Sequence, residues 1–211
     1  MIVEEMMRRN VKTLSPDHTI SDAIQLLRSN KIRHLPITIE NKVVGIVTDR
    51  DIKEASANRS EQEELRSIRL ESIMTKNPII GHPLDFVEEV AVTFFDQHIG
   101  CLPIVQNGEL VGIVTETDVL YKYIELTGAN KPGSHLEVRV PDRPGVLYEV
   151  TKVFYEHQVN VWSVLVYPDP KQDNTKILVF RLKTMNPLTI IQDLRKEGFD
   201  VLWPNMPGMS E

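Results

Sequence analysis

Two stretches in the N-terminal half of the chain carry apolar residues at three- and four-residue spacing. This spacing predicts amphipathic helices that begin after Thr19 and after Asp85. Thr19 is an expected helix cap, and Asp85 with Glu88 has the spacing of a capping box. Two short apolar runs after each helix predict a hairpin, and a further helix is expected to begin near Asp49 and near Glu116. The predicted hairpin strands are 35–39 with 43–47, and 102–105 with 110–114, the second pair joined through the turn dipeptide Asn107-Gly108. The order of elements predicted for each of these two regions is therefore β-α-β-β-α.

The same pattern occurs twice at one constant spacing. Sliding the sequence by 67 residues places the segment Val-Gly-Ile-Val-Thr at 44–48 on the identical segment at 111–115, and no gap is needed. We expect two equivalent modules about a pseudo-twofold axis, the first at 1–57 and the second at 73–127. The polar stretch 58–72 between them is interpreted as a solvated helix or a linker.

The pattern changes after a segment rich in Gly and Pro at 127–134, which predicts a third domain over 134–204. Its expected elements are strand 136–140, helix 146–157, strands 160–167 and 175–182, helix 187–196 and strand 200–203. This βαββαβ order predicts a small antiparallel sheet covered on one face, in the manner of a ferredoxin-like fold. The whole chain is thus expected to be an α/β (α+β) protein.

The composition is that of a globular protein, with 41% hydrophobic and 26% charged residues. The net charge of −6 comes with scattered basic residues, which argues against a nucleic-acid partner. The start of the sequence is unlike a signal peptide, and no stretch approaches the ~18 apolar residues of a membrane span. Cys101 is the only cysteine, so no intramolecular disulfide can form, and we expect a cytoplasmic protein.

No catalytic or metal-binding constellation is recognisable in the sequence. The six histidines are dispersed, and no Ser/His/Asp arrangement, zinc motif or glycine-rich phosphate loop is present. We interpret Cys101 as a small packing or cleft residue and not as a nucleophile.

The positions that suggest chemistry are Thr48 with Asp51 and Thr115 with Asp118, each pair at a junction where a strand ends and a helix begins. Backbone amides and the helix dipole favour a phosphate at such a junction, the threonine hydroxyl can add a hydrogen bond, and the aspartate can accept from ribose hydroxyls. The alternative is purely local, because a threonine cap followed three positions later by an acidic residue is a common helix start. Asp is shorter than the usual Glu of that box, which favours the ligand slightly.

These residues lie in runs that resemble the CBS domain, and two in tandem resemble a CBS pair over about residues 1–127. The runs are Arg-His-Leu-Pro-Ile at 33–37 and Gly-Ile-Val-Thr-Asp-Arg-Asp at 45–51, repeated as Cys-Leu-Pro-Ile at 101–104 and Gly-Ile-Val-Thr-Glu-Thr-Asp at 112–118. The resemblance implies a disc with two related clefts that commonly hold an adenine nucleotide (AMP, ADP or ATP) or S-adenosylmethionine and regulate a partner.

By position, the resemblance implies three roles. Asp51 and Asp118 would hold ribose hydroxyls, Thr48 and Thr115 would help with phosphate, and Thr13 and Ile80 would lie beside the adenine or ribose.

The two clefts are not expected to be equivalent. Arg33 and His34 occupy positions where such modules place cationic phosphate contacts, whereas the second copy has Gly100 and Cys101 there. The resemblance puts Arg33 near the axis, where it could serve either cleft. His34 has two open readings, a phosphate ligand or an exposed or structural histidine.

In the third domain, the run Asp-Arg-Pro-Gly-Val-Leu at 142–147 resembles the ACT domain over about 134–204. This implies sheets paired side by side between subunits, with small ligands, often amino acids, bound by Asp142, Gly145 and Asn160. Many such domains merely dimerise. Pro at the first helical position and Gly in a tight turn also have a purely conformational explanation.

The domain order and length, together with the segments Met-Asn-Pro-Leu at 185–188 and Val-Leu-Trp-Pro at 201–204, resemble the acetoin-utilisation B protein (AcuB) family, which implies a bacterial protein linked to acetoin or acetate metabolism. The leading hypothesis is a non-catalytic nucleotide sensor with a regulated enzyme partner, forming a homo-oligomer, most simply a homodimer. The alternative is a structural or scaffolding homodimer with vestigial clefts. An enzyme acting on acetoin or a nucleotide has the least support, because no nucleophile, base or metal set can be named.

Overall fold

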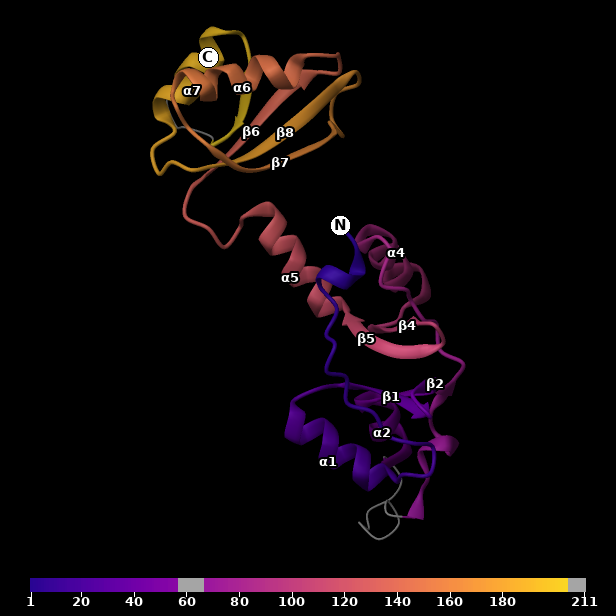
Figure 1. Ribbon diagram of the computed structural model, residues 1–211. Helices are drawn as coiled ribbons and strands as arrows, with labels where there is room; N and C mark the ends of the chain where they lie inside the picture. Colours follow the sequence, from indigo (N-terminus) through magenta and orange to yellow (C-terminus); the bar gives the residue numbers. More distant parts are fainter. Residues whose placement is uncertain (57–66, 205–211) are drawn as a thin grey trace. The chain divides into compact units, whose positions relative to one another are not determined.

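The computed structural model describes residues 1–56 and 67–204, and the chain forms two compact units, Met1–Leu120 and Tyr121–Glu211 (Figure 1). Most of the polar stretch predicted at 58–72 lies outside the described residues. The mixed α/β class predicted from the sequence is confirmed.

The first half of the N-terminal unit follows the predicted order. Its elements are helix α1 (Ile20–Asn30), strands β1 (His34–Ile39) and β2 (Lys42–Thr48), and helix α2 (Asp49–Ser56). The predicted strand ahead of α1 is reduced to a single bridge between Leu14 and Ile37. β1 and β2 form an antiparallel hairpin with a bulge between Ile37 and Thr38.

The second half repeats this arrangement. Its elements are α4 (Val87–Gln97), β4 (Cys101–Gln106), β5 (Glu109–Thr115) and α5 (Glu116–Thr127), a helix that continues from Tyr121 into the second unit. Gly81 bridges Ile104 as Leu14 bridges Ile37. Asn107 and Gly108 both have positive φ, 53° and 83°, which is what the predicted two-residue turn requires.

The two predicted helix caps have different outcomes. Thr19 caps α1 in a full capping box with Asp22, whose carboxylate accepts from the Thr19 amide at 2.8 Å, and these bonds lower the pKa of Asp22. The capping box expected from Asp85 and Glu88 is wrong, because the N-cap of α4 is Phe86. Asp85 instead accepts a hydrogen bond from the His82 amide at 2.6 Å and closes the turn before the helix.

The segment that leads into each module completes the sheet and core of the other module. The short strand β3 (Thr75–Lys76), which leads into the second module, pairs with β2 of the first. In the mirror arrangement, Arg8 forms a bridge with Ile113 of β5. Leu70, from the 3-10 turn η2 (Leu70–Ser72), packs in the core of the first module; Val3, from the 3-10 turn η1 (Val3–Glu5), packs in that of the second. The halves are therefore interlocked.

Two glycines accommodate these exchanged segments. A Cβ built on Gly45 would lie 2.5 Å from the sulfur of Met74, and one on Gly112 would lie 2.6 Å from the sulfur of Met7. Both glycines sit in the repeated Val-Gly-Ile-Val-Thr run, so the run carries a packing requirement in addition to its strand character.

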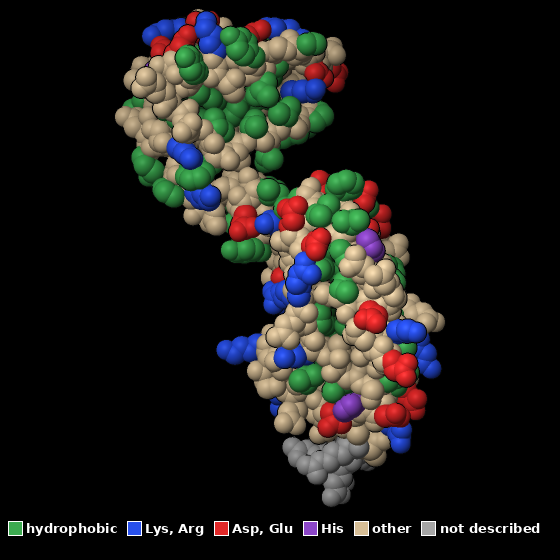
Figure 2. Space-filling view, viewed as in Figure 1, with side chains coloured by type: hydrophobic (Ala, Val, Ile, Leu, Met, Phe, Trp, Pro, Cys, Tyr) green, Lys and Arg blue, Asp and Glu red, His purple; other side chains and the backbone are tan. Residues whose placement is uncertain are grey.

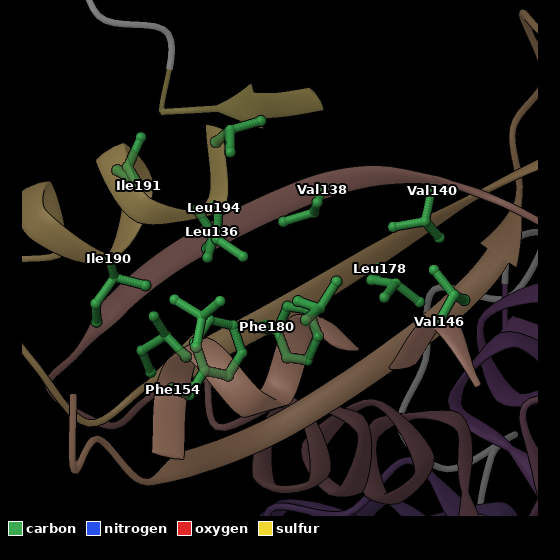
Figure 3. Packing of buried hydrophobic residues seen from close by; sticks show 14 residues of the cluster. Leu136, Val138, Val140, Val146, Phe154, Leu178, Phe180, Ile190, Ile191 and Leu194 are labelled. Carbon is green, nitrogen blue, oxygen red and sulfur yellow. The ribbon is translucent and has the colours of Figure 1, made fainter. Parts of the chain in front are cut away.

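The C-terminal unit is a four-stranded antiparallel sheet with two helices. Its elements are β6 (Ser134–Pro141), α6 (Val146–Glu156), β7 (Val161–Pro168), β8 (Thr175–Leu182), α7 (Leu188–Lys196) and β9 (Asp200–Trp203). The strand order is β7-β8-β6-β9, so β7 is an edge strand. Figure 3 shows the core between sheet and helices, where the rings of Phe154 and Phe180 meet edge to face at 4.8 Å.

The start of α6 differs in detail from the prediction. Gly145, with φ 85°, is the N-cap, so Pro144 precedes the cap and does not occupy the first helical position. The positive φ explains the glycine, because other L residues adopt it at a cost.

The exchange of leading segments predicts that Leu70 is as important to stability as any core residue of the first module. Leu70 is fully buried, so Leu70→Ala is expected to lower the free energy of unfolding by about 2–5 kcal/mol. Urea denaturation followed by circular dichroism measures the change. Leu84→Ala, at a leucine that is 60% exposed, is the control and should change it by less than about 0.5 kcal/mol. Equal effects of the two substitutions would contradict the packing described.

Candidate functional site

A cleft of about 560 Å³ lies where β2 ends and α2 begins. Thr48 and Asp51 line one wall, and Gly100 and Cys101 of the second module line another. Thr75, from the exchanged segment, also borders the cavity. We call it the Thr48 cleft.

A second cleft of about 350 Å³ lies at the matching position, where β5 ends and α5 begins. It is bordered by Thr115 and Thr117, by Arg8 of the exchanged segment, and by Arg33 and His34 of the first module. We call it the Thr115 cleft. Because most wall positions recur 67 residues away in the other cleft, the two cavities are related by the pseudo-twofold axis; Asp51 lines the Thr48 cleft, whereas its counterpart Asp118 does not line the Thr115 cleft.

Each strand-to-helix junction is closed by a capping box of its own. The carboxylate of Asp51 accepts from the amide and the hydroxyl of Thr48, both at 2.7 Å, and the Asp51 amide donates to the Thr48 hydroxyl at 3.3 Å. Asp118 accepts from Thr115 in the same way, at 3.0 and 2.6 Å. The local interpretation of these pairs is therefore realised, and both aspartates reach back to the threonine although Asp is shorter than Glu.

The carboxylates differ in what their second oxygen does. Oδ2 serves the capping box in both. Oδ1 of Asp118 accepts from the guanidinium of Arg8 at 2.7 and 2.9 Å. Oδ1 of Asp51 has no hydrogen bond to any other residue that the structure describes, so it remains available on the wall of the Thr48 cleft.

The charges that line the two clefts also differ. Among the described residues, the walls of the Thr115 cleft hold four cationic side chains and no carboxylate; the cations are Arg8, Lys12, Lys31 and Arg33, and Arg8 is paired with Asp118, which lies outside the lining. The walls of the Thr48 cleft combine two cations with three carboxylates; these are Arg33, Arg50, Asp49, Asp51 and Glu116. The Thr115 cleft is therefore the better match for a phosphate.

Arg33 and His34 stand on the walls of both clefts. The pKa of His34 lies below its ordinary value, first because burial disfavours the charged ring and second because Arg33 is close. A Cβ on Gly100 would lie 3.0 Å from Nε2 of His34, so the glycine gives room to this imidazole. From the sequence alone, Gly100 indicated only the absence of the cation that Arg33 provides in the first copy.

Two residues expected near the adenine or ribose lie beside the clefts. Thr13 and Ile80 do not line either cavity, while their preceding neighbours Lys12 and Ile79 do. Ile80 is 50% exposed.

Cys101 is buried beside the Thr48 cleft. Burial raises the pKa of its thiol to about 12, with a further contribution from the charges of Asp51 and Glu116. This environment suits a packing residue and opposes thiolate chemistry. Among the described residues, no group of three or more His, Cys, Asp or Glu side chains could hold a metal ion, and no helix is long and apolar enough to span a membrane.

The three residues expected to bind a ligand in the C-terminal unit are not brought together within one chain. Asp142 follows the end of β6 and pairs with Lys176 at 2.7 Å, near the start of β8. Asn160 precedes β7, and its carbonyl accepts from the Lys183 amide just beyond the other end of β8. An eight-residue strand separates them by roughly 25 Å, since each residue of a strand advances about 3.4 Å. Gly145 lies with Asp142 in the turn before α6.

Comparisons with known proteins agree with this architecture. Residues 3–58 and 70–125 match the CBS domain family, and residues 134–199 match the ACT domain family. The chain belongs to the CBS domain family, as a tandem pair followed by an ACT domain.

Relatives share mainly the paired modules. Homoserine O-acetyltransferase of Methanococcus vannielii is 34% identical over 120 residues, which cover 56% of this chain and 24% of that enzyme. A CBS domain-containing protein of Dictyostelium discoideum is 30% identical over 143 residues, which cover 64% of this chain and 99% of that protein. The chain spans only about a quarter of the length of several enzymes that it matches.

Three solved structures resemble the N-terminal unit. The CBS domain pair of protein MJ0100, in complex with 5′-methylthioadenosine and S-adenosyl-L-methionine, is 32% identical with a TM-score of 0.53 and covers 62% of this chain and 98% of its own. A putative acetoin utilization protein (AcuB) from Vibrio cholerae is 34% identical with a TM-score of 0.54, covering 63% and 98%. CBSX2 in complex with AMP is 26% identical with a TM-score of 0.51, covering 58% and 96%.

The environment of Cys101 predicts slow thiol chemistry. Because its pKa is raised to about 12, almost no thiolate is present at pH 8, and the folded chain should react with iodoacetamide at least tenfold more slowly than the chain in guanidinium chloride. Mass spectrometry of timed samples measures the rate. Labelling of the folded chain as fast as of the unfolded chain would show that the thiol is neither buried nor perturbed.

Proposed function

We propose that this chain is a non-catalytic regulatory protein that senses adenine nucleotides through its CBS pair. The observation that carries the proposal is the Thr115 cleft, whose walls at a strand-to-helix junction hold Lys12, Lys31 and Arg33 together with Arg8, which is paired with Asp118. A phosphate placed there gains charge-assisted hydrogen bonds. The adenosine compounds bound by the related MJ0100 pair and the AMP bound by CBSX2 support the choice of ligand class.

The interlocked halves supply a route from ligand to response. Each cleft is lined by residues of both modules and by an exchanged segment, so a bound nucleotide contacts both halves at once. A ligand that prefers one packing of the modules shifts the population toward that packing. A partner enzyme that recognises the selected packing would then be regulated.

The ACT domain is proposed to pair with a second copy. β7 is an edge strand, and it exposes Val164, Leu165, Val166 and Tyr167. Figure 2 shows hydrophobic side chains gathered on the surface of this unit. Pairing along this edge covers its free backbone groups. A small-molecule site made of Asp142, Gly145 and Asn160 would need residues from two chains, since one chain holds Asn160 far from Asp142 and Gly145.

The link to acetoin or acetate metabolism rests on likeness alone. The Vibrio cholerae protein named as a putative AcuB matches 63% of this chain, and the CBS matches lie at 3–58 and 70–125. We include that metabolic context in the proposal and assign no reaction to the chain.

The second candidate is a scaffolding homodimer with vestigial clefts. Its supporting observation is that both junction aspartates already serve the protein, Asp51 in a capping box and Asp118 in a capping box and an ion pair.

Calorimetric titration with AMP, ADP, ATP and S-adenosylmethionine distinguishes the two candidates. The sensor proposal expects saturable binding of at least one of them, weakened about tenfold or more by Asp51→Asn or Asp118→Asn in the affected cleft, because a hydrogen bond to a charged group contributes about 1.5–3 kcal/mol. Asp96→Ala, at an exposed residue of α4, is the control. Failure of all four compounds to bind at millimolar concentration would favour the scaffold.

AMP binding is expected to depend on the protonation of His34. The pKa of the free ring is depressed, and a nearby phosphate favours the protonated form, so binding takes up a proton and AMP affinity increases as pH falls from 8 towards 6. Calorimetry in buffers of different ionisation enthalpy counts the protons.

His34→Gln is the matched control for this pH dependence, because AMP's own phosphate also titrates near pH 6. Proton uptake should be lower in the variant. Equal proton uptake by both chains would show that His34 is not part of the phosphate site.

A further inference from the structure

The ion pair between Arg8 and Asp118 breaks the symmetry of the repeat. Arg8 donates through Nε and Nη2 to the same carboxylate oxygen, although 110 residues separate the two in sequence. The equivalent position in the other half is Thr75, which borders the Thr48 cleft but has no side chain long enough to reach Asp51 in this way. Only one of the two junction aspartates is therefore held by a cation of its own protein, among the described residues.

This contact determines what a ligand must do to use Asp118. One oxygen accepts from Thr115 and the other from Arg8, and only 12% of the aspartate side chain is exposed. A ribose hydroxyl that is to donate to Asp118 must first displace the guanidinium. No such displacement is required at Asp51, whose Oδ1 is unpaired among the described residues.

The displaced guanidinium has a second anion within reach when the ligand carries a phosphate. The Arg8 side chain is 60% exposed and borders the same cavity as Lys12, Lys31 and Arg33. A guanidinium binds phosphate at least as well as carboxylate, through parallel N–H donors. A nucleotide therefore replaces the ion pair that it breaks with a phosphate–Arg8 pair. A nucleoside or thioether analogue breaks the pair and provides no anion for the guanidinium.

We propose that Arg8 is a specificity-determining residue that makes the Thr115 cleft select phosphorylated over unphosphorylated adenosine compounds by exchanging Asp118 for the ligand phosphate. The inference rests on the proposed binding of adenine nucleotides in this cleft. The Thr48 cleft has Thr75 in place of Arg8 and three carboxylates on its walls, so it lacks this selection for phosphorylated compounds.

The test compares AMP with adenosine in a chain whose Thr48 cleft is weakened about tenfold or more by Asp51→Asn. In that background, Arg8→Thr copies the residue that the other half carries at this position. The backbone geometry is already shared, because Arg8 bridges Ile113 as Thr75 pairs with Ile46. Arg8→Met is a second variant that retains the aliphatic stem.

Calorimetry is expected to show adenosine binding about two- to fivefold tighter in the Arg8 variants, because a partly exposed competing ion pair of modest strength is gone. AMP should bind about fivefold or more weakly, because a charge-assisted bond to phosphate is lost. The AMP-to-adenosine preference should then fall at least tenfold. Adenosine affinity should increase with salt in the Arg8 chain, as the pair is screened, and should not do so in the variants.

The neighbouring arginine provides a matched control. Arg9 is equally exposed and pairs with Glu4 at 2.8 Å, but it does not line the cleft, so Arg9→Thr should leave the preference unchanged. An unchanged preference in the Arg8 variants, or an equal loss of both ligands, would overturn the role of Arg8. If the Asp51→Asn chain with Arg8 intact binds neither AMP nor adenosine, the proposed function of this cleft fails first and the inference fails with it.

Discussion

The reciprocal exchange of leading segments is the contact on which the N-terminal unit depends. Each module lacks part of its own sheet and core, and the segment that leads into its partner fills the gap: Leu70 and Met74 pack in the first module, while Val3 and Met7 pack in the second. The same two segments then run along the clefts and place Thr75 in one and Arg8 in the other. The same two segments therefore both interlock the modules and form part of the cleft walls.

Much of this architecture could be predicted because it depends on local pattern. The repeat, the hairpins and the βαββαβ order follow from periodicity and turn residues, and the helices after Thr48 and Thr115 begin where the pattern placed them. Features set by distant contacts could not be predicted. Asp85 closes a turn instead of capping a helix, and the pairing of Arg8 with Asp118 joins residues 110 apart, which no window of sequence contains.

At the candidate site, sequence reasoning treated helix capping and ligand binding as alternatives. In the structure, Oδ2 of Asp51 closes the capping box with Thr48, while Oδ1 has no hydrogen bond to another described residue, and Asp51 lines the cleft. The sequence predicted unequal clefts from a missing cation at Gly100 and Cys101, but Arg33 lines both clefts, and the pairing of Asp118 with Arg8 was not predicted. A short residue pattern indicates which groups are present, and only the fold shows which of them are already bonded.

The exchange also bears on how such a chain could arise. A protein made of one repeat would carry a segment that fits a neighbouring module and a groove beside Gly45 that, in this chain, the other module's segment fills. Two identical copies could satisfy both needs at once, each lending its segment to the other. Joining the copies end to end turns that symmetric partnership into a single polypeptide, after which the halves are free to diverge, as Arg8 and Thr75 have done.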